Sequence, residues 1–149
     1  MRMNKKLMLI MMLSFLTLSI FSVFTRGKFE VLAQDSASLT GIIYDRDLDT
    51  DLDGDSDYLE VGVEVAVETP GKYEISIEGL MDSSGNYINV YDYRYLFLDV
   101  GIQVVNLTLS GEMIYSSRRN ASKVASITIK NETWYWLGSL YDVPLSKEY

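Results

Sequence analysis

Cysteine and histidine are both absent from the 149 residues of this chain. Their absence excludes disulfide bonds, zinc sites of the usual cysteine and histidine type, cysteine nucleophiles and every catalytic group that depends on an imidazole. The strong metal ligands that remain are oxygen atoms. Oxygen ligands favour calcium, with magnesium as the second choice.

Basic residues are scarce outside the N-terminal segment. From Gln34 onward the chain has 20 acidic and 8 basic residues, which gives a net charge of −12. Seven of these acidic residues lie between Asp45 and Asp57. This balance argues against binding to nucleic acid or to an anionic membrane surface, and it suits a cation-binding site in a solvated exterior.

A long apolar run occupies the N-terminal segment. Residues Leu7 to Phe24 are apolar apart from three serines and one threonine, and they follow the basic residues Arg2, Lys5 and Lys6. This pattern is typical of a cleaved signal peptide or of a retained helical membrane anchor, and small residues before Gln34 offer a cleavage site. Both alternatives place the remainder of the chain outside the cell, either secreted or anchored at its surface.

The most informative segment runs from Asp49 to Glu60 and reads Asp-Thr-Asp-Leu-Asp-Gly-Asp-Ser-Asp-Tyr-Leu-Glu. A twelve-residue calcium loop has oxygen ligands at positions 1, 3, 5, 7, 9 and 12 and a glycine at position 6. Starting two residues earlier or later fails, because Leu52 or Ser56 then occupies the glycine position. The predicted ligands are the side chains of Asp49, Asp51 and Asp53, the backbone carbonyl of Asp55, Asp57 directly or through water, and bidentate Glu60.

The alternative interpretation of this segment is an acidic, disordered linker, because runs of like charge are usually disordered. Gly54 and Glu60 favour the calcium loop, since a merely acidic linker needs neither a turn residue nor a terminal carboxylate at these positions. Repulsion among the carboxylates also disfavours a compact loop without a cation.

Alternation of apolar and polar residues with a period of two dominates the rest of the chain. It predicts strands over Val61–Val67 and Tyr73–Ile77, joined through a type II turn at Thr69–Lys72 as a hairpin. Further strands are predicted at Gly41–Tyr44, Tyr87–Val100, Ile102–Leu109, Met113–Tyr115, Val124–Ile129 and Thr133–Leu137. No helical pattern follows residue 34, so we expect an all-β fold, an antiparallel β-sandwich of about six to eight strands, immunoglobulin-like or jelly-roll-like.

Four parts are therefore expected along the chain. Residues 1–33 form the signal peptide or membrane anchor, an apolar helix, and residues 34–44 form a linker. The calcium loop covers residues 45–60 and precedes the β-sandwich domain of residues 61–149.

The loop resembles the Asp-x-Asp-x-Asp-Gly motif shared by EF-hands, dockerins and thrombospondin type 3 repeats. Its passage into Val-x-Val-x-Val and then Gly-Lys-Tyr-x-Ile is similar to secreted prokaryotic, especially archaeal, surface proteins. That resemblance implies a calcium loop that leads into a β-sandwich appended to secreted enzymes or adhesins. Unlike an EF-hand, the segment has no helix before Asp49, a strand after Glu60 and no second loop, which favours a structural ion over a sensor.

Two surface features suggest partners. One face of a predicted strand carries Tyr87, Tyr91, Tyr93 and Tyr95, and Trp134 and Trp136 share a face of another. Such rings can stack on sugars. The alternative is structural, because tyrosine suits half-buried sheet surfaces and tryptophan suits a sandwich core. The glycosylation motifs begin at Asn106, Asn120 and Asn131.

The sequence thus predicts an exported calcium-binding module with a structural, adhesive or accessory role, not an enzyme. A carbohydrate-binding module is the alternative, and its partner would be a cell-surface polysaccharide; a cell-surface protein is the other candidate partner. A small secreted hydrolase is the third and least favoured, because no nucleophile motif is present.

Overall fold

The computed structural model describes residues 36–149, so the predicted signal peptide or anchor over residues 1–33 lies outside the described part of the chain. The described residues belong to one compact unit. Among them, no helix is long and apolar enough to cross a membrane.

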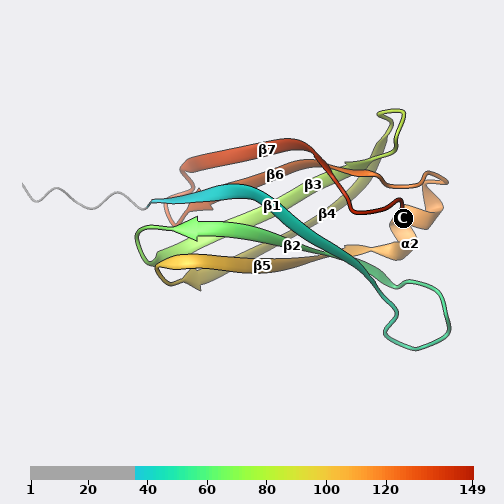
Figure 1. Ribbon diagram of the computed structural model, residues 1–149, viewed down its shortest axis with the longest axis horizontal. Helices are drawn as coiled ribbons and strands as arrows, with labels where there is room; N and C mark the ends of the chain where they lie inside the picture. The colour runs from blue at the N-terminus through green and yellow to red at the C-terminus, as the bar shows by residue number, and fades with distance from the viewer. Residues whose placement is uncertain (1–35) are drawn as a thin grey trace, which may run out of the picture. The chain divides into compact units, whose positions relative to one another are not determined.

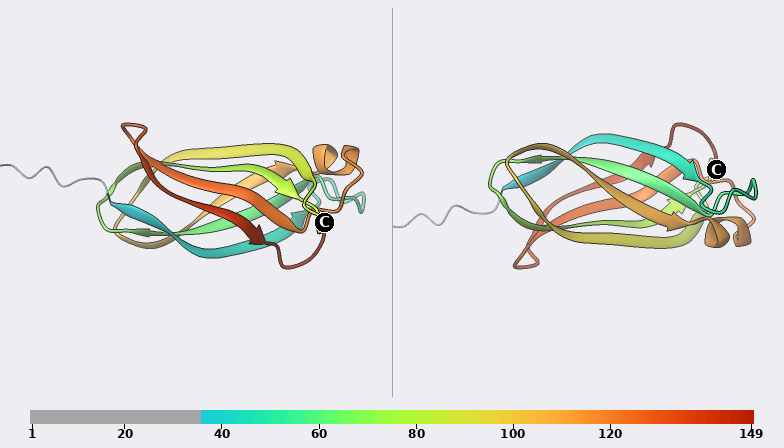
Figure 2. Two further views of the ribbon diagram at one scale, coloured as in Figure 1. Left: turned by 90° about the horizontal axis from the view of Figure 1, so that it is seen from above. Right: turned by 90° about the horizontal axis from the view of Figure 1, so that it is seen from below.

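Seven strands form two antiparallel sheets that lie face to face (Figure 1; Figure 2). Sheet A has the order β1-β2-β5 and contains β1 (Ala37–Leu48), β2 (Tyr58–Val67) and β5 (Gly101–Ser110). Sheet B has the order β4-β3-β6-β7 and contains β3 (Gly71–Met81), β4 (Tyr87–Leu98), β6 (Lys123–Asn131) and β7 (Trp136–Pro144). One short helix, α2 (Gly111–Ser116), follows β5. The all-β fold predicted from the alternation is confirmed, and its two layers are those of a β-sandwich.

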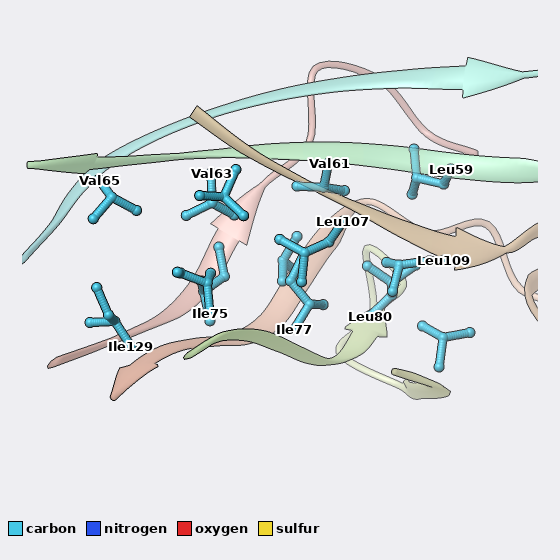
Figure 3. Packing of buried hydrophobic residues seen from close by; sticks show 14 of the residues in the cluster. Leu59, Val61, Val63, Val65, Ile75, Ile77, Leu80, Leu107, Leu109 and Ile129 are labelled. Atoms are coloured by element: carbon cyan, nitrogen blue, oxygen red, sulfur yellow. The ribbon is translucent and has the colours of Figure 1, made fainter. Parts of the chain in front are cut away.

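The core lies between the two sheets and is built from alternate residues of the strands (Figure 3). Its fully buried members include Val61, Val63, Val65, Leu107 and Leu109 from sheet A and Ile75, Ile77, Leu80 and Ile129 from sheet B. Each buried aliphatic side chain contributes about 1.5–3 kcal/mol relative to an exposed one, and neither sheet can bury its inner face without the other.

The predicted hairpin between the strands Val61–Val67 and Tyr73–Ile77 is wrong. β2 pairs with β1 and β5, whereas β3 pairs with β4 and β6, so the turn at Thr69–Pro70–Gly71 carries the chain from one sheet to the other. Strands that face each other across a core have the same alternation as strands paired in one sheet, so periodicity does not distinguish them. The Tyr73 hydroxyl donates to the Thr69 carbonyl at 2.6 Å and holds this crossover.

The first strand begins earlier than the sequence predicts. β1 starts at Ala37, inside the range assigned to a linker, because its backbone pairs with the end of β2: Ala37 lies opposite Val67, and Leu39 lies opposite Val65. The acidic segment therefore connects two strands of sheet A instead of preceding the sandwich.

Two further strand predictions need correction. Met113–Tyr115 lies in α2, whose N-cap Ser110 accepts a hydrogen bond from the Met113 backbone N–H at 3.3 Å. Thr133–Leu137 is not one strand, since the chain turns after Asn131 and resumes as β7 at Trp136. The turn contains Trp134 at a φ of 63°, a left-handed conformation that a pattern of β-prone residues does not anticipate.

The loops gather at the two ends of the sandwich. The acidic segment, α2 and the C-terminus lie at one end, and the β2–β3, β4–β5 and β6–β7 connections lie at the other (Figure 1). The antiparallel order of the strands places them so, because consecutive strands reverse direction.

A polar contact joins β4 and β5, which are edge strands of different sheets. The Asp92 carboxylate accepts a hydrogen bond from the Thr108 backbone N–H at 2.7 Å, and Arg94 donates to the Thr108 hydroxyl at 3.1 Å. Arg94 and Asp92 also form an ion pair at 2.8 Å. A side chain of sheet B thereby satisfies one backbone N–H at the edge of sheet A.

Candidate metal centre

Three aspartates converge in the loop that joins β1 to β2, which we call the acidic loop (residues 49–57). Asp49, Asp51 and Asp57 each offer a carboxylate oxygen, and these oxygens all lie within 4.8 Å of one another. Asp49 and Asp57 are half-buried, whereas Asp51 is exposed. This cluster could hold a metal ion, because a hard cation is bound by several oxygen atoms that point at one centre.

Asp49 organises the first half of the acidic loop. One of its carboxylate oxygens accepts from the Leu52 backbone N–H at 2.7 Å, and the other accepts from the Gly54 N–H at 3.0 Å. Leu52 and Gly54 have φ angles of 64° and 100°, so the chain winds tightly around this carboxylate. The predicted sharp turn at Gly54 is confirmed, and its positive φ is one that glycine adopts without steric penalty.

Asp57 closes the acidic loop. Its carboxylate accepts from the Thr50 backbone N–H at 2.7 Å and makes a second, shorter hydrogen bond with the Thr50 hydroxyl. These hydrogen bonds from Thr50, the side-chain one foremost, lower the pKa of Asp57 below its usual value. The carboxylate is therefore ionised at neutral pH, the state in which it can bind a cation. The sequence motif does not single out Thr50.

The other predicted ligands lie outside this cluster. Asp53 accepts from the Asp55 backbone N–H at 2.9 Å within the loop. Glu60 lies on β2 and pairs with Arg46 of β1, with a nitrogen–oxygen distance of 2.7 Å. The structure thus brings together the carboxylates of Asp49, Asp51 and Asp57, and the carboxylates of Asp53 and Glu60 are not part of this cluster.

A glycine far away in the sequence supports the end of the acidic loop. The Gly111 backbone N–H donates to the Asp57 carbonyl at 2.8 Å. A Cβ atom at Gly111 would lie 2.2 Å from the Ser56 carbonyl oxygen and 2.8 Å from the Asp57 carbonyl oxygen. Because both are backbone atoms, only a residue without a side chain allows this approach. The sequence offers no signal for the contact, since it depends on the three-dimensional proximity of α2.

The acidic residues just before the loop bind the C-terminal residues instead of joining the cluster. The Asp45 carboxylate accepts from the Ser146 backbone N–H at 2.9 Å and from the Tyr149 hydroxyl at 2.7 Å. Asp47 pairs with Lys147 at 2.9 Å. Burial, followed by the hydrogen bond to Asp45, raises the pKa of Tyr149 to about 12. The acidic segment therefore divides into a part that anchors the chain end and a part that forms the cluster.

The predicted glycosylation acceptors differ in accessibility. Asn106 on β5 and Asn120, between α2 and β6, are exposed. Asn131 ends β6 with 7% of its surface exposed, and its side-chain oxygen accepts from the Thr133 backbone N–H at 3.1 Å. Modification of Asn131 would require this turn to open.

No protein-family model, curated protein or solved structure matches the chain, so no family match supports the resemblance of the loop to EF-hands, dockerins and thrombospondin type 3 repeats.

Replacing Gly111 with alanine should destabilise the protein by on the order of 1–3 kcal/mol, because the added methyl group displaces the backbone of the acidic loop. Denaturant unfolding measures the change. Gly138→Ala is the matched control, since a Cβ there meets its nearest neighbour at an ordinary 3.8 Å. Equal destabilisation by the two substitutions would contradict the close contact at Gly111.

Tyr149→Phe should lower stability at pH 8 and change its pH dependence. With the folded-state pKa of Tyr149 at about 12 and the unfolded-state value at about 10, the stabilising contribution is complete below pH about 10 and is lost as the pH rises toward 12. The difference in denaturation midpoint between wild type and Tyr149→Phe should therefore shrink above pH about 10. Tyr115→Phe, at a residue that is 86% exposed, serves as the control. A constant difference between wild type and Tyr149→Phe across this range would refute the assignment.

Proposed function

We propose that the acidic loop binds one calcium ion and that this ion has a structural role in an exported β-sandwich module. The observation that supports this proposal is the convergence of Asp49, Asp51 and Asp57 to within 4.8 Å. The ion offsets the repulsion among these carboxylates and fixes the connection between β1 and β2.

The donor set suits calcium better than other common metals. Nitrogen and sulfur ligands of the zinc type are missing from the sequence, and carboxylate and carbonyl oxygens are what calcium and magnesium bind. Calcium accepts six to eight oxygens in irregular geometry, whereas magnesium demands an octahedron and keeps more of its water. A flexible loop with several carboxylates and backbone carbonyls therefore favours calcium.

The full twelve-residue ligand set adds Asp53, the Asp55 carbonyl and Glu60 to the three converging aspartates. Bidentate binding by Glu60 requires the Oε1 atom that Arg46 holds, because both contacts from the guanidinium fall on this oxygen. The two versions of the site, with and without Glu60, are separated by an experiment below.

A structural role follows from the position of the loop. The loop directly follows β1 and directly precedes β2, and the Gly111 N–H at the start of α2 donates to the carbonyl of Asp57, the last residue of the loop. An ion that binds the folded state adds about 2.7 kcal/mol of stability when its free concentration is a hundredfold above the dissociation constant. Solitary extracellular loops of this kind bind calcium with dissociation constants of about 10⁻⁴–10⁻³ M.

The proposed setting is the cell exterior, with the chain secreted or held by its N-terminal apolar segment. The basic residues and the apolar run of the N-terminal segment support export, and the acidic composition suits a metal-stabilised domain. We assign the sandwich to the immunoglobulin-like arrangement, since it has a three-stranded and a four-stranded sheet, whereas a jelly roll has eight strands. The module would serve an adhesive or accessory role at the surface.

Millimolar calcium should raise the melting temperature of the protein, and Asp49→Ala should abolish the rise, because this substitution removes a carboxylate of the cluster and the acceptor for Gly54. Asp99→Ala is the charge-matched control, since Asp99 lies in the β4–β5 connection at the other end of the sandwich. Calorimetry with calcium, with magnesium and with a chelator gives the measurement. An unchanged melt of the wild type in calcium would refute the proposal.

The participation of Glu60 can be tested by replacing Arg46, which competes with an ion for the Glu60 carboxylate. If Glu60 binds calcium, Arg46→Met should increase calcium affinity more than Lys147→Met does, because only the first substitution releases the Glu60 carboxylate. Both variants remove one positive charge beside the acidic segment, so the electrostatic effect is matched. Titration calorimetry compares them, and equal gains would exclude Glu60 from the site.

A further inference from the structure

The outer face of sheet B carries two rows of exposed aromatic side chains. Tyr91, Tyr93, Tyr95 and Phe97 alternate along β4 with residues turned toward the core, and each has roughly half of its surface exposed. Trp136 and Tyr141 lie on β7, at the other edge of the same sheet. Exposed rings concentrated on one sheet face are unusual for a soluble surface and mark an interaction site.

Small hydroxyl side chains lie between the two rows. Ser76 of β3 and Thr128 of β6 are cross-strand partners, are 2% exposed and share a hydrogen bond of 2.7 Å. The same cross-strand register continues to Tyr93 on one side and to Ser139 on the other. Residues directly opposite in antiparallel strands present their side chains on the same face, so tyrosine, serine, threonine and serine form one line across the sheet.

One end of this face is held in a fixed geometry. The Trp134 ring lies parallel to the Tyr95 ring, with an interplanar angle of 3° and centroids 6.4 Å apart. Its turn is fastened by Asn131, whose side-chain oxygen accepts from the Tyr135 backbone N–H at 2.9 Å. The Lys130 ammonium lies 4.9 Å from the Trp136 ring centroid and 3.1 Å from a Glu74 oxygen. Rings from β4, the β6–β7 turn and β7 thus form one preorganised surface.

The chemistry of the face favours an uncharged, hydroxyl-rich ligand. Its charged groups are largely paired, Glu74 with Lys130 at 3.1 Å and Lys72 with Glu132 at 4.0 Å. The exposed large hydrophobic side chains of its four strands are all aromatic. The outer face of sheet A differs, because there Ile42, Ile102 and Val104 are exposed. An aliphatic surface suits a protein partner, and rings interleaved with hydroxyls suit a sugar.

We propose that the outer face of sheet B binds a neutral polysaccharide chain. The apolar C–H faces of its sugar rings would lie on the tyrosine and tryptophan rings. Its hydroxyls would exchange hydrogen bonds with the accessible polar groups of the face, which are the tyrosine hydroxyls, Ser139 and Glu78. Burial and the nearby carboxylates of Glu74 and Glu78 raise the pKa of Tyr91, which keeps its hydroxyl available as a donor. This site is separate from the acidic loop, which lies at the opposite end of the sandwich from the β6–β7 turn (Figure 1).

The test is binding of the purified full-length chain to a panel of neutral polysaccharides. Soluble xylan, glucomannan, mixed-linkage β-glucan and pullulan are used in native affinity gels, and cellulose and chitin in depletion assays. At least one should retain the protein, and Tyr93→Ala or Trp136→Ala should weaken that retention by about tenfold or more, since each removes a stacking surface. Tyr44→Ala is the matched control, because Tyr44 is similarly exposed on sheet A.

Melting curves of the variants are recorded alongside, and Tyr93→Ala should melt close to the wild type. Retention by none of the six polysaccharides overturns the proposal, as does retention that both Tyr93→Ala and Trp136→Ala leave unchanged. Sedimentation measures self-association in the same samples. Dimerisation that either variant abolishes would make a second copy of the chain the occupant and would also overturn the proposal. Asp49→Ala should leave retention unchanged, which separates this site from the calcium site.

Discussion

Burial of alternate residues between the two sheets determines which side chains are left for function. Once Leu59 and Val61 face the core, Glu60 between them must face outward, where Arg46 of the neighbouring strand meets it. The same parity turns Tyr91 and Tyr93 outward as soon as Val90 is buried on β4. The strand register that fills the core therefore also determines which residues face outward.

The alternation in the sequence predicts the strands well because it reflects this burial directly. Val61–Val67 and Ile102–Leu109 lie within strands of the structure. The alternation does not predict which strands pair. Two strands have the same alternating sequence pattern whether they face each other across the core or lie side by side in one sheet. This is why the turn at Thr69–Pro70–Gly71 resembles a hairpin turn but crosses between layers. At Trp134, hydrogen bonds to Asn131 outweigh the β-propensity of the aromatic residues.

The spacing of the acidic residues predicts the loop, but it does not predict which aspartates form the cluster and which bind other parts of the chain. The regular repeat of aspartates and Gly54 are visible in the sequence, and three of the aspartates do converge. The bonds that hold Asp45 to Tyr149 join residues about a hundred positions apart, and the contact of Gly111 with Asp57 spans half as many. Such contacts depend on which loops the topology gathers at one end of the sandwich. Local spacing therefore identifies the acidic loop, and long-range packing decides which carboxylates remain available to an ion.

The contact between Asp92 and Thr108 affects how this edge of the sandwich can meet other chains. An open edge strand offers its backbone groups to any other chain, and two sheets facing each other leave such edges on both sides. Here the Asp92 carboxylate at the edge of sheet B accepts a hydrogen bond from the Thr108 N–H at the edge of sheet A. The ion pair between Asp92 and Arg94 places charge beside this bond. An approaching strand would have to displace a charged group to extend the sheet at this point. The contact thereby disfavours the addition of a further strand at this position of the edge.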